Sequence, residues 1–175
     1  LVNEAGYVFD DGLVCAVAPN DYYLTFTSAG GYNVEAWLRD WAETWRLRVH
    51  ILNLTTACGA INLAGPRARE VLASLTADPI DAGALPHGHV RRITVAGVSC
   101  LAMRVGFVGE LSFELHHPSS RSVTLWDALL AAGAGAGIQP HGLDALLLLR
   151  LEKGHIVVGQ DTDFDSSPQK LGLSW

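Results

Sequence analysis

Apolar positions along the first part of the chain change from a strand-like to a helical spacing. Residues 14–17 and 22–27 are rich in aromatic and β-branched side chains and flank a short turn, which predicts a β-hairpin. From residue 32 to residue 46 the apolar side chains recur every three or four positions, which predicts an amphipathic helix. We expect its tryptophans to pack against a sheet or a neighbour rather than to form a ligand platform; they are Trp37, Trp41 and Trp45.

The rest of the chain consists of short apolar runs and three helical patterns. The predicted strands are residues 47–54, 57–63, 91–95, 98–103 and 110–116. The predicted helices are residues 67–75, a segment that begins at Pro118, and residues 141–153, after which Gly154 is placed to end the helix. Strands joined both by hairpins and by helices indicate an α+β fold with a largely antiparallel sheet and packed helices.

The composition narrows the class of protein. Of the 175 residues, 49% are hydrophobic and only 17% are charged, so intrinsic disorder is excluded. A formal net charge of −6, without a run of lysine or arginine, argues against nucleic-acid binding. The apolar stretches are far shorter than the ~20 residues that a membrane-spanning helix needs. We therefore expect neither a nucleic-acid partner nor a membrane partner.

The low charge requires an explanation of its own. Either the core is very apolar, or a neighbouring domain or subunit covers part of the surface. The chain opens at Leu1 and closes on the apolar residues 171–175, which favours the second explanation because natural termini are usually polar. We expect residues 1–175 to form a single domain that is truncated from a larger unit.

Cysteine and histidine usage points away from disulfides and metals. Cys15, Cys58 and Cys100 form no CxxC motif and each sits in an apolar run, so we expect buried free thiols in a reducing cytoplasm. The acidic stretch 161–165 lacks the glycine and the closing glutamate of a calcium-binding loop. The histidine pairs have no acidic or cysteine partners at ligand spacing, so no metal site is expected.

Asp10 and Asp11 form an acid pair inside an apolar stretch. In a strand their side chains would point to opposite faces, so that one carboxylate could face a pocket while the other faces solvent. A carboxylate beside apolar walls can have a raised pKa and act as a base or a hydrogen-bond acceptor. The alternative is that Asp10, Asp11 and Gly12 form a simple turn, and the pattern leaves both open.

A second candidate site begins where two glycines frame Phe107. If residues 110–114 form a strand, then Glu110, Ser112 and Glu114 share one face and the alternate side chains point to the core. Such a carboxylate can accept two parallel hydrogen bonds from a ring N–H and an exocyclic amine of a flat heterocycle. The alternative is a glycine-flanked hairpin whose glutamates face solvent.

Taken in order, these motifs resemble the aminomethyltransferase family, which includes the T-protein of glycine cleavage and the folate-binding modules of sarcosine and dimethylglycine oxidases. The matching segments are residues 3–12, 65–72, 95–98, 104–115, 149–154, 159–161 and 168–175. Residues 152–163 are most similar to the flavoenzyme-fused branch, such as the α-subunit of heterotetrameric sarcosine oxidase. Phe107, Thr27 and Leu146 stand where the T-protein branch has tyrosine, asparagine and a folate-contacting arginine.

The resemblance implies a partial folate-binding domain, without the upstream part and the C-terminal barrel of the family. It also implies tetrahydrofolate-dependent transfer of an aminomethyl or methylene group. The product would be 5,10-methylenetetrahydrofolate, and the one-carbon unit would come from oxidation of an amine such as sarcosine or from glycine cleavage. Folate and a small amine-derived donor would be the partners. The chain has no flavin-binding fingerprint, so any flavin would belong to a flavoprotein partner domain or subunit.

The resemblance also assigns roles to four residues. Asp11 would act as the catalytic base near N10 of the folate, without a metal. Glu114 would hold the pterin through its N–H and amino groups, Phe107 would line or stack on the ring system, and Thr27 would line the site. Two alternatives stay open. One is a folate-dependent demethylase on the same fold, and the other is a non-catalytic module that binds folate or docks a subunit.

Overall fold

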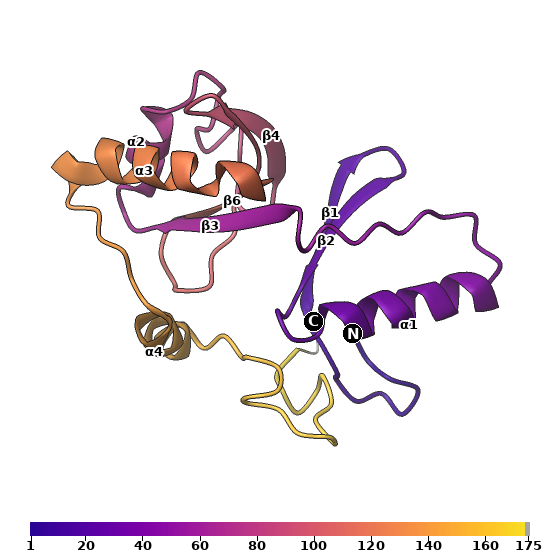
Figure 1. Cartoon of the computed structure of the whole chain (residues 1–175). Coiled ribbons are helices and arrows are strands. Elements are labelled where there is room, and N and C mark those ends of the chain that lie inside the picture. Colours follow the sequence, from indigo (N-terminus) through magenta and orange to yellow (C-terminus); the bar gives the residue numbers. More distant parts are fainter. Residues whose placement is uncertain (174–175) are drawn as a thin grey trace. The chain divides into compact units, whose positions relative to one another are not determined.

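The computed structural model describes residues 1–173 and divides into two compact units. The hairpin unit comprises residues 1–54 together with the stretch from Ile156 onward, and the sheet unit comprises residues 55–155. Figure 1 labels the elements along the chain. Within the described part of the chain, no helix has both the length and the apolar character that crossing a membrane requires.

The sheet unit is built on four antiparallel strands in the order β3-β6-β5-β4. The strands are β3 (Cys58–Ala64), β4 (Val90–Val95), β5 (Val98–Met103) and β6 (Ser112–Pro118). The helices are α2 (Ala68–Ala73), α3 (Ser122–Gly133) and α4 (Leu143–Lys153), with short 3-10 turns η1 (Ser119–Arg121) and η2 (Ala134–Ala136). Antiparallel strands with helices packed on them confirm the predicted α+β class.

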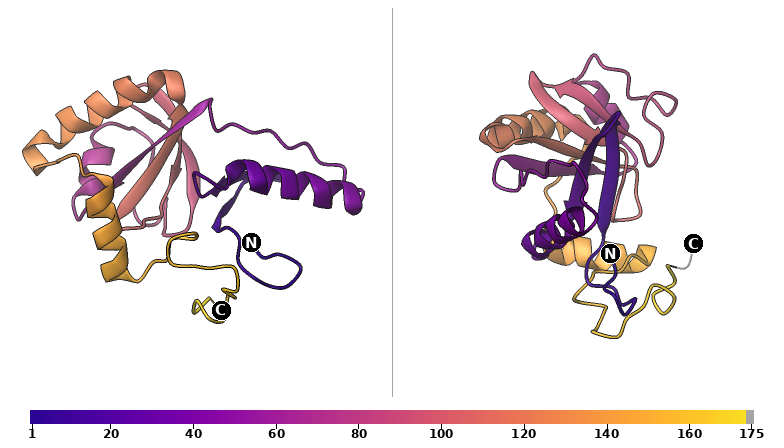
Figure 2. Two further views of the ribbon diagram at one scale, coloured as in Figure 1. Left: turned by 60° about the horizontal axis from the view of Figure 1, so that its bottom comes forward. Right: turned by 90° about the vertical axis from the view of Figure 1, so that its right-hand side faces the viewer.

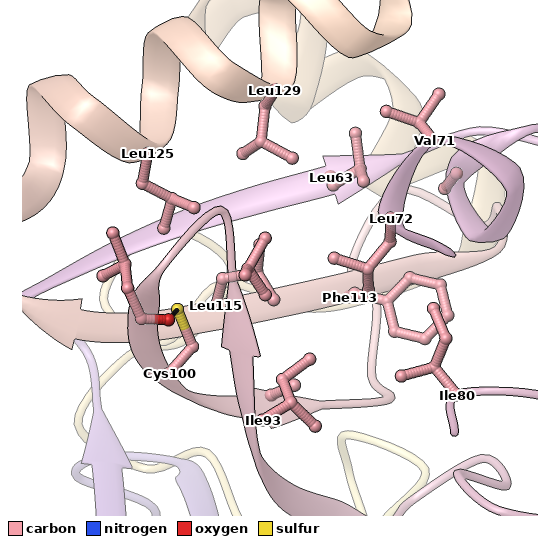
Figure 3. Close-up of a cluster of buried hydrophobic side chains, with 14 of the residues drawn as sticks. Leu63, Val71, Leu72, Ile80, Ile93, Cys100, Phe113, Leu115, Leu125 and Leu129 are labelled. Carbon is pink, nitrogen blue, oxygen red and sulfur yellow. Dashed lines mark hydrogen bonds between the residues drawn. The ribbon is translucent and has the colours of Figure 1, made fainter. Parts of the chain in front are cut away.

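The core of the sheet unit lies between the sheet and the helices α2 and α3. Figure 2 shows α3 running along one face of the sheet. In Figure 3, Leu125 of α3 and Leu72 of α2 point toward Phe113 and Leu115 of β6, and all four side chains are 0% exposed. Because side chains alternate along a strand, Phe113 and Leu115 enter the core while Glu114 lies on the opposite face. The predicted alternation along this strand is therefore confirmed.

The hairpin unit contains β1 (Gly12–Ala18), β2 (Asp21–Phe26) and α1 (Gly31–Thr44). The two strands form the predicted antiparallel hairpin, and Asn20 takes a positive φ of 61° in its turn. A two-stranded hairpin is marginal by itself, so it depends on further packing. The tryptophans of the helical segment contact one another in sequence, and the centroids of Phe9 and Trp37 lie 5.6 Å apart at the start of this row.

One predicted strand is wrong. Residues 47–54 alternate like a strand but form neither a helix nor a strand. Side-chain hydrogen bonds hold this segment instead: Arg39 Nη2 donates to the carbonyl of Ile51 at 2.8 Å, and Asn53 Nδ2 donates to Glu35 Oε2 at 2.7 Å. Alternation favours an extended backbone, but a strand exists only where a neighbouring strand accepts and donates its main-chain hydrogen bonds.

Other boundaries shift by a few residues. β6 begins at Ser112 rather than at residue 110, so Glu110 lies outside the strand. The segment after Pro118 first forms η1 and only then α3, and α4 starts at Leu143. Gly154 ends α4 as predicted, with a left-handed φ of 85° that suits a residue without a side chain.

The cysteine prediction needs one correction. All three cysteines are free thiols, but only Cys15 and Cys100 are buried, and Cys58 is partly exposed at the start of β3. Burial raises the pKa of Cys100 to about 11, so this thiol stays protonated and unreactive at neutral pH.

The burial pattern of α3 gives a test of the core. Leu125→Ala is expected to lower the free energy of unfolding by about 2–5 kcal/mol, because it leaves a cavity where the side chain was fully buried. Val123→Ala is the control on the same helix: Val123 is 73% exposed, so its change should stay within about 0.5 kcal/mol. Urea denaturation followed by circular dichroism measures both, and equal losses would contradict the assigned face of α3.

Candidate functional site

The acid pair sits immediately before β1, and the two carboxylates have different surroundings. The Asp10 side chain is buried, at 1% exposure, and accepts three hydrogen bonds. The donors are the backbone N–H of Asp11 at 2.8 Å, the backbone N–H of Thr27 at 3.2 Å and the Thr27 hydroxyl at 3.0 Å. Asp10 thus connects the start of β1 to the residue that follows β2.

Gly30 makes this arrangement possible. A Cβ at residue 30 would lie 1.6 Å from Asp10 Oδ2 and 2.7 Å from Thr27 Oγ1, so only glycine lets α1 begin against the buried carboxylate. The Thr27 hydroxyl is directed to Asp10 in this contact. The expected role of Thr27 as a site-lining residue stays a prediction.

Asp11 is partly exposed, and the electrostatic environment of its carboxylate differs from that of Asp10. Partial burial raises the pKa of Asp11 above the ordinary carboxyl value, and the neighbouring Asp10 raises it further. The residue lies immediately before β1, and residues 10 and 11 form neither a strand nor a turn, so neither of the two predicted alternatives describes the pair. The structure therefore separates the pair into a buried structural acid and an accessible acid whose proton affinity is increased.

In the sheet unit, Glu114 projects from β6 on the face opposite the core. Its side chain is 28% exposed, and His116 Nε2 lies 3.3 Å from Glu114 Oε2. Across the sheet Glu114 is paired with Asn62 of β3 on one side and with the fully buried Met103 of β5 on the other. The carboxylate is thus accessible, has an apolar neighbour, and has one oxygen oriented by an imidazole.

Phe107 lies in the loop between β5 and β6. Its ring stacks on that of His155, with centroids 5.2 Å apart and planes 13° from parallel. The loop is anchored where it meets β6, because Arg104 Nη1 donates to the carbonyl of Ser112 at 3.3 Å and the Ser112 hydroxyl donates to the carbonyl of Glu110 at 3.1 Å. Glu110 is exposed and lies outside β6, so the strand face that the longer predicted strand gave to Glu110 and Glu114 does not extend to residue 110.

The four predicted site residues fall into two pairs. Asp11 and Thr27 belong to the hairpin unit, whereas Phe107 and Glu114 belong to the sheet unit. Sequence analysis missed three contributors: Asp10 as the structural member of the acid pair, His116 beside Glu114, and His155 on Phe107. A signal existed only for His116, which lies two residues after Glu114 and so shares its strand face.

No group of three or more potential metal ligands of the His, Cys, Asp or Glu type gathers anywhere in residues 1–173. What the structure offers chemically is accessible carboxylates at Asp11 and Glu114 and an aromatic surface at Phe107. These groups suit hydrogen bonding, proton transfer and ring stacking.

A family model described as "GCVT N-terminal domain" matches residues 1–175, which is the whole chain. The chain belongs to this family. The matched range contains all the motifs on which the resemblance rested, so the predicted aminomethyltransferase relationship is confirmed.

Enzymes of three kinds are among the curated relatives of this GCVT domain. Sarcosine oxidase subunit alpha from Corynebacterium sp. (strain U-96) is 33% identical over 97% of this chain and 18% of its own length. An aminomethyltransferase from Caldanaerobacter subterraneus subsp. tengcongensis is 32% identical over 100% of this chain and 46% of its own. Human mitochondrial dimethylglycine dehydrogenase is 30% identical over 100% of this chain and 20% of its own length. The chain thus spans less than half the length of each.

A solved structure supports the fold of this GCVT domain. Heterotetrameric sarcosine oxidase from Corynebacterium sp. U-96, in complex with pyrrole 2-carboxylate, aligns with a TM-score of 0.57 and 16% sequence identity. The alignment covers 75% of this chain and 64% of the other. At this identity the likeness concerns the fold.

The different surroundings of the acid pair predict opposite effects on stability. Asp10→Ala is expected to lower the free energy of unfolding by more than about 2 kcal/mol, because it removes a buried charged acceptor of three hydrogen bonds. Asp11→Asn is expected to leave the GCVT domain as stable as the wild type or more stable at pH 7. Thermal unfolding of both variants measures the difference.

The sign for Asp11 follows from linkage. Its raised pKa in the folded state means that the protonated form stabilises the fold, and that this contribution is lost as the pH rises through the folded-state pKa. Any advantage of Asp11→Asn should therefore be largest at neutral pH and shrink as the pH falls toward the ordinary carboxyl value of about 4. An advantage that grows on acidification would contradict the raised pKa.

Proposed function

We propose that this chain is a tetrahydrofolate-dependent module that transfers a one-carbon unit, at the aminomethyl or methylene level, to form 5,10-methylenetetrahydrofolate. The observation that carries the proposal is the difference in burial and proton affinity between Asp10 and Asp11. Asp10 is buried and accepts hydrogen bonds from Asp11 and Thr27, whereas Asp11 is partly exposed and has a pKa that partial burial and the charge of Asp10 raise. A carboxylate with increased proton affinity in a fixed place is what general-base catalysis of amine attack requires.

The residues of the sheet unit fit a reduced pterin. A pterin presents an adjacent ring N–H and amino group, and the Glu114 carboxylate is accessible enough to accept two parallel hydrogen bonds from them. His116 beside one carboxylate oxygen restricts the rotation of the side chain, so the acceptor geometry is set in advance. Phe107 adds a flat apolar surface of the size of one ring. In this proposal Glu114 and Phe107 bind and orient the folate.

Bound tetrahydrofolate supplies nucleophilic ring and aryl amines to an electrophilic one-carbon donor. Each of the two amines that would bond to the carbon would have to give up one proton, so that both protons could leave with the oxygen or nitrogen displaced from the carbon. A base near the first amine would take its proton. The Asp11 carboxylate accepts that proton, and its raised pKa increases the driving force for the transfer. The protonated Asp11 can then return the proton to the oxygen or nitrogen that leaves the carbon.

The source of the one-carbon unit is inferred from the relatives of this domain. The names of its relatives describe sarcosine oxidation and dimethylglycine dehydrogenation, and both amines carry N-methyl groups. We therefore propose a small amine-derived donor, released by a flavoprotein domain or subunit with which this module works in the cytoplasm. The 18–46% share of the relatives' lengths supports a module that acts as part of a larger enzyme.

A second function is favoured by one feature of the hairpin unit. It exposes several large apolar side chains, among them Tyr32 at 71%, Trp45 at 62% and Leu52 at 77%. Such side chains are typical of surfaces that another domain or subunit covers. A module that binds folate and docks a partner without catalysing transfer is therefore the alternative, and the role of Asp11 distinguishes the two.

In this proposal Glu114 serves folate binding and Asp11 serves catalysis, so substitutions at the two residues should have different effects. Glu114→Ala is expected to weaken tetrahydrofolate binding at least about 30-fold, because two charge-assisted hydrogen bonds are lost. Glu110→Ala is the matched control, since Glu110 is an exposed glutamate four residues earlier in the chain, and its affinity should stay within about twofold of wild type. Anaerobic isothermal titration calorimetry measures both. Equal affinities for the two variants would remove Glu114 from the site.

Asp11→Asn is expected to bind tetrahydrofolate normally and to transfer poorly. Loss of a general base reduces the rate by about 10²–10⁴-fold, while the neutral amide keeps the size of the side chain. The measurement is the rate of 5,10-methylenetetrahydrofolate formation from tetrahydrofolate and formaldehyde, above the uncatalysed rate. An unchanged rate in Asp11→Asn, with folate still bound, would remove the catalytic role of Asp11. A wild-type chain that binds folate but does not exceed the uncatalysed rate would be assigned to the non-catalytic alternative.

A further inference from the structure

We propose that His155 is a positioning residue of the folate site, which holds the Phe107 ring in the orientation that receives the folate ring system. The inference rests on the proposed function and extends it to His155, a residue within the 152–163 motif to which the sequence assigned no role. His155 follows α4, forty-eight positions after Phe107, and the two meet only because the chain folds.

The contact has the geometry of an offset stack. The ring centroids lie 5.2 Å apart and the planes are 13° from parallel, which is a preferred arrangement for two aromatic rings. A ring has two faces, and His155 lies over one face of Phe107. The Phe107 side chain is partly exposed, and in this proposal the folate ring stacks on the face opposite His155.

The backbone of His155 is held by a single buried side chain and its own helix. The His155 N–H donates to the carbonyl of Arg150 at 2.9 Å, and Arg150 Nη1 donates to the carbonyl of His155 at 3.1 Å. Arg150 is only 1% exposed, so its position is set by the packing around it. Gly154, with its left-handed φ of 85°, turns the chain so that both bonds can form.

The loop that carries Phe107 has less support of its own. Residues 104–111 form no helix or strand. A Cβ on Gly106 would lie 2.6 Å from the Ser112 hydroxyl, and one on Gly109 would lie 3.4 Å from Cβ of Lys153, so the loop passes close to β6 and to the end of α4. These contacts fix the backbone of the loop. The orientation of the Phe107 ring is fixed by the histidine that stacks on it.

A ring that is already oriented loses less freedom when a ligand binds than a ring that rotates freely. Removal of His155 should therefore weaken folate binding through Phe107, while the hydrogen bonds to Glu114 remain. The effect should depend on a planar side chain at residue 155 and not on its polarity or volume alone. This dependence distinguishes positioning from a general contribution to stability.

The test is calorimetric titration of the 175-residue chain with tetrahydrofolate under anaerobic conditions, in the wild type and three variants. His155→Ala is expected to bind about 5- to 20-fold more weakly. His155→Phe, which restores a planar ring, should return to within about twofold of wild type. His155→Leu, which has similar bulk but no planar ring, should stay as weak as His155→Ala. Thermal unfolding of each variant reports whether the chain is folded.

A second readout is independent of affinity. The His155 ring protons should show a ring-current shift from Phe107 in the NMR spectrum of the free chain, and that shift should disappear in Phe107→Leu. Wild-type affinity in His155→Ala, or equal affinities for the phenylalanine and leucine variants, would overturn the inference and leave the proposed function intact. A folded wild-type chain that does not bind tetrahydrofolate would overturn both.

Discussion

The register of β6 is the constraint on which the sheet unit depends. This strand lies between β3 and β5, and its pairing with β3 runs from Ser112 to Pro118 without interruption. In this register Phe113 and Leu115 enter the core, and Glu114 and His116 lie on the other face. A slip of one residue would bury a glutamate beside Leu72 and expose a phenylalanine. The same hydrophobic contacts that stabilise the core therefore determine the face of the sheet on which Glu114, the candidate pterin-binding residue, lies.

In the hairpin unit a buried polar group, the Asp10 carboxylate, holds the segments together. Two strands and one helix bury little apolar surface, and the buried Asp10 carboxylate joins the segments before β1 and after β2 while Gly30 lets α1 start against it. Desolvation of this charge is offset by three hydrogen bonds, two of them from backbone N–H groups. Its negative charge in turn raises the pKa of Asp11. Burial of Asp11 and the charge of this structural carboxylate together raise the proton affinity of Asp11.

The function proposed for Asp11 and the stability of the fold place opposite demands on this residue. A carboxylate whose pKa is raised by partial burial is less stable in its charged form than one in water. A protein selected only for stability would place a neutral side chain there. That this GCVT domain keeps an aspartate, next to another aspartate, is consistent with a role for the charged form in proton transfer. At Glu114 and Phe107, by comparison, the contacts with His116 and His155 would set the orientation of the proposed folate-binding groups.

Local patterns in the sequence determined much of this protein. The alternation along β6, the helical spacing in α1 and α3, and the glycine that ends α4 each depend on neighbours within a few positions, so they can be recognised without a structure. The motifs around Asp11, Phe107 and Glu114 are local too, and they led to the family. The lengths of the segments were predictable only to within a few residues, because helix and strand ends depend on packing.

Tertiary structure decided what depends on partners distant in the chain. Residues 47–54 have the alternation of a strand, but no neighbouring strand in the described chain pairs with them, and α1 side chains hold them instead. Which aspartate of the pair is buried depended on Thr27 and Gly30, and the stacking of His155 on Phe107 depended on Arg150. Local sequence sets which face a side chain occupies, whereas burial, hydrogen-bond partners and proton affinity are set by residues that only folding brings near.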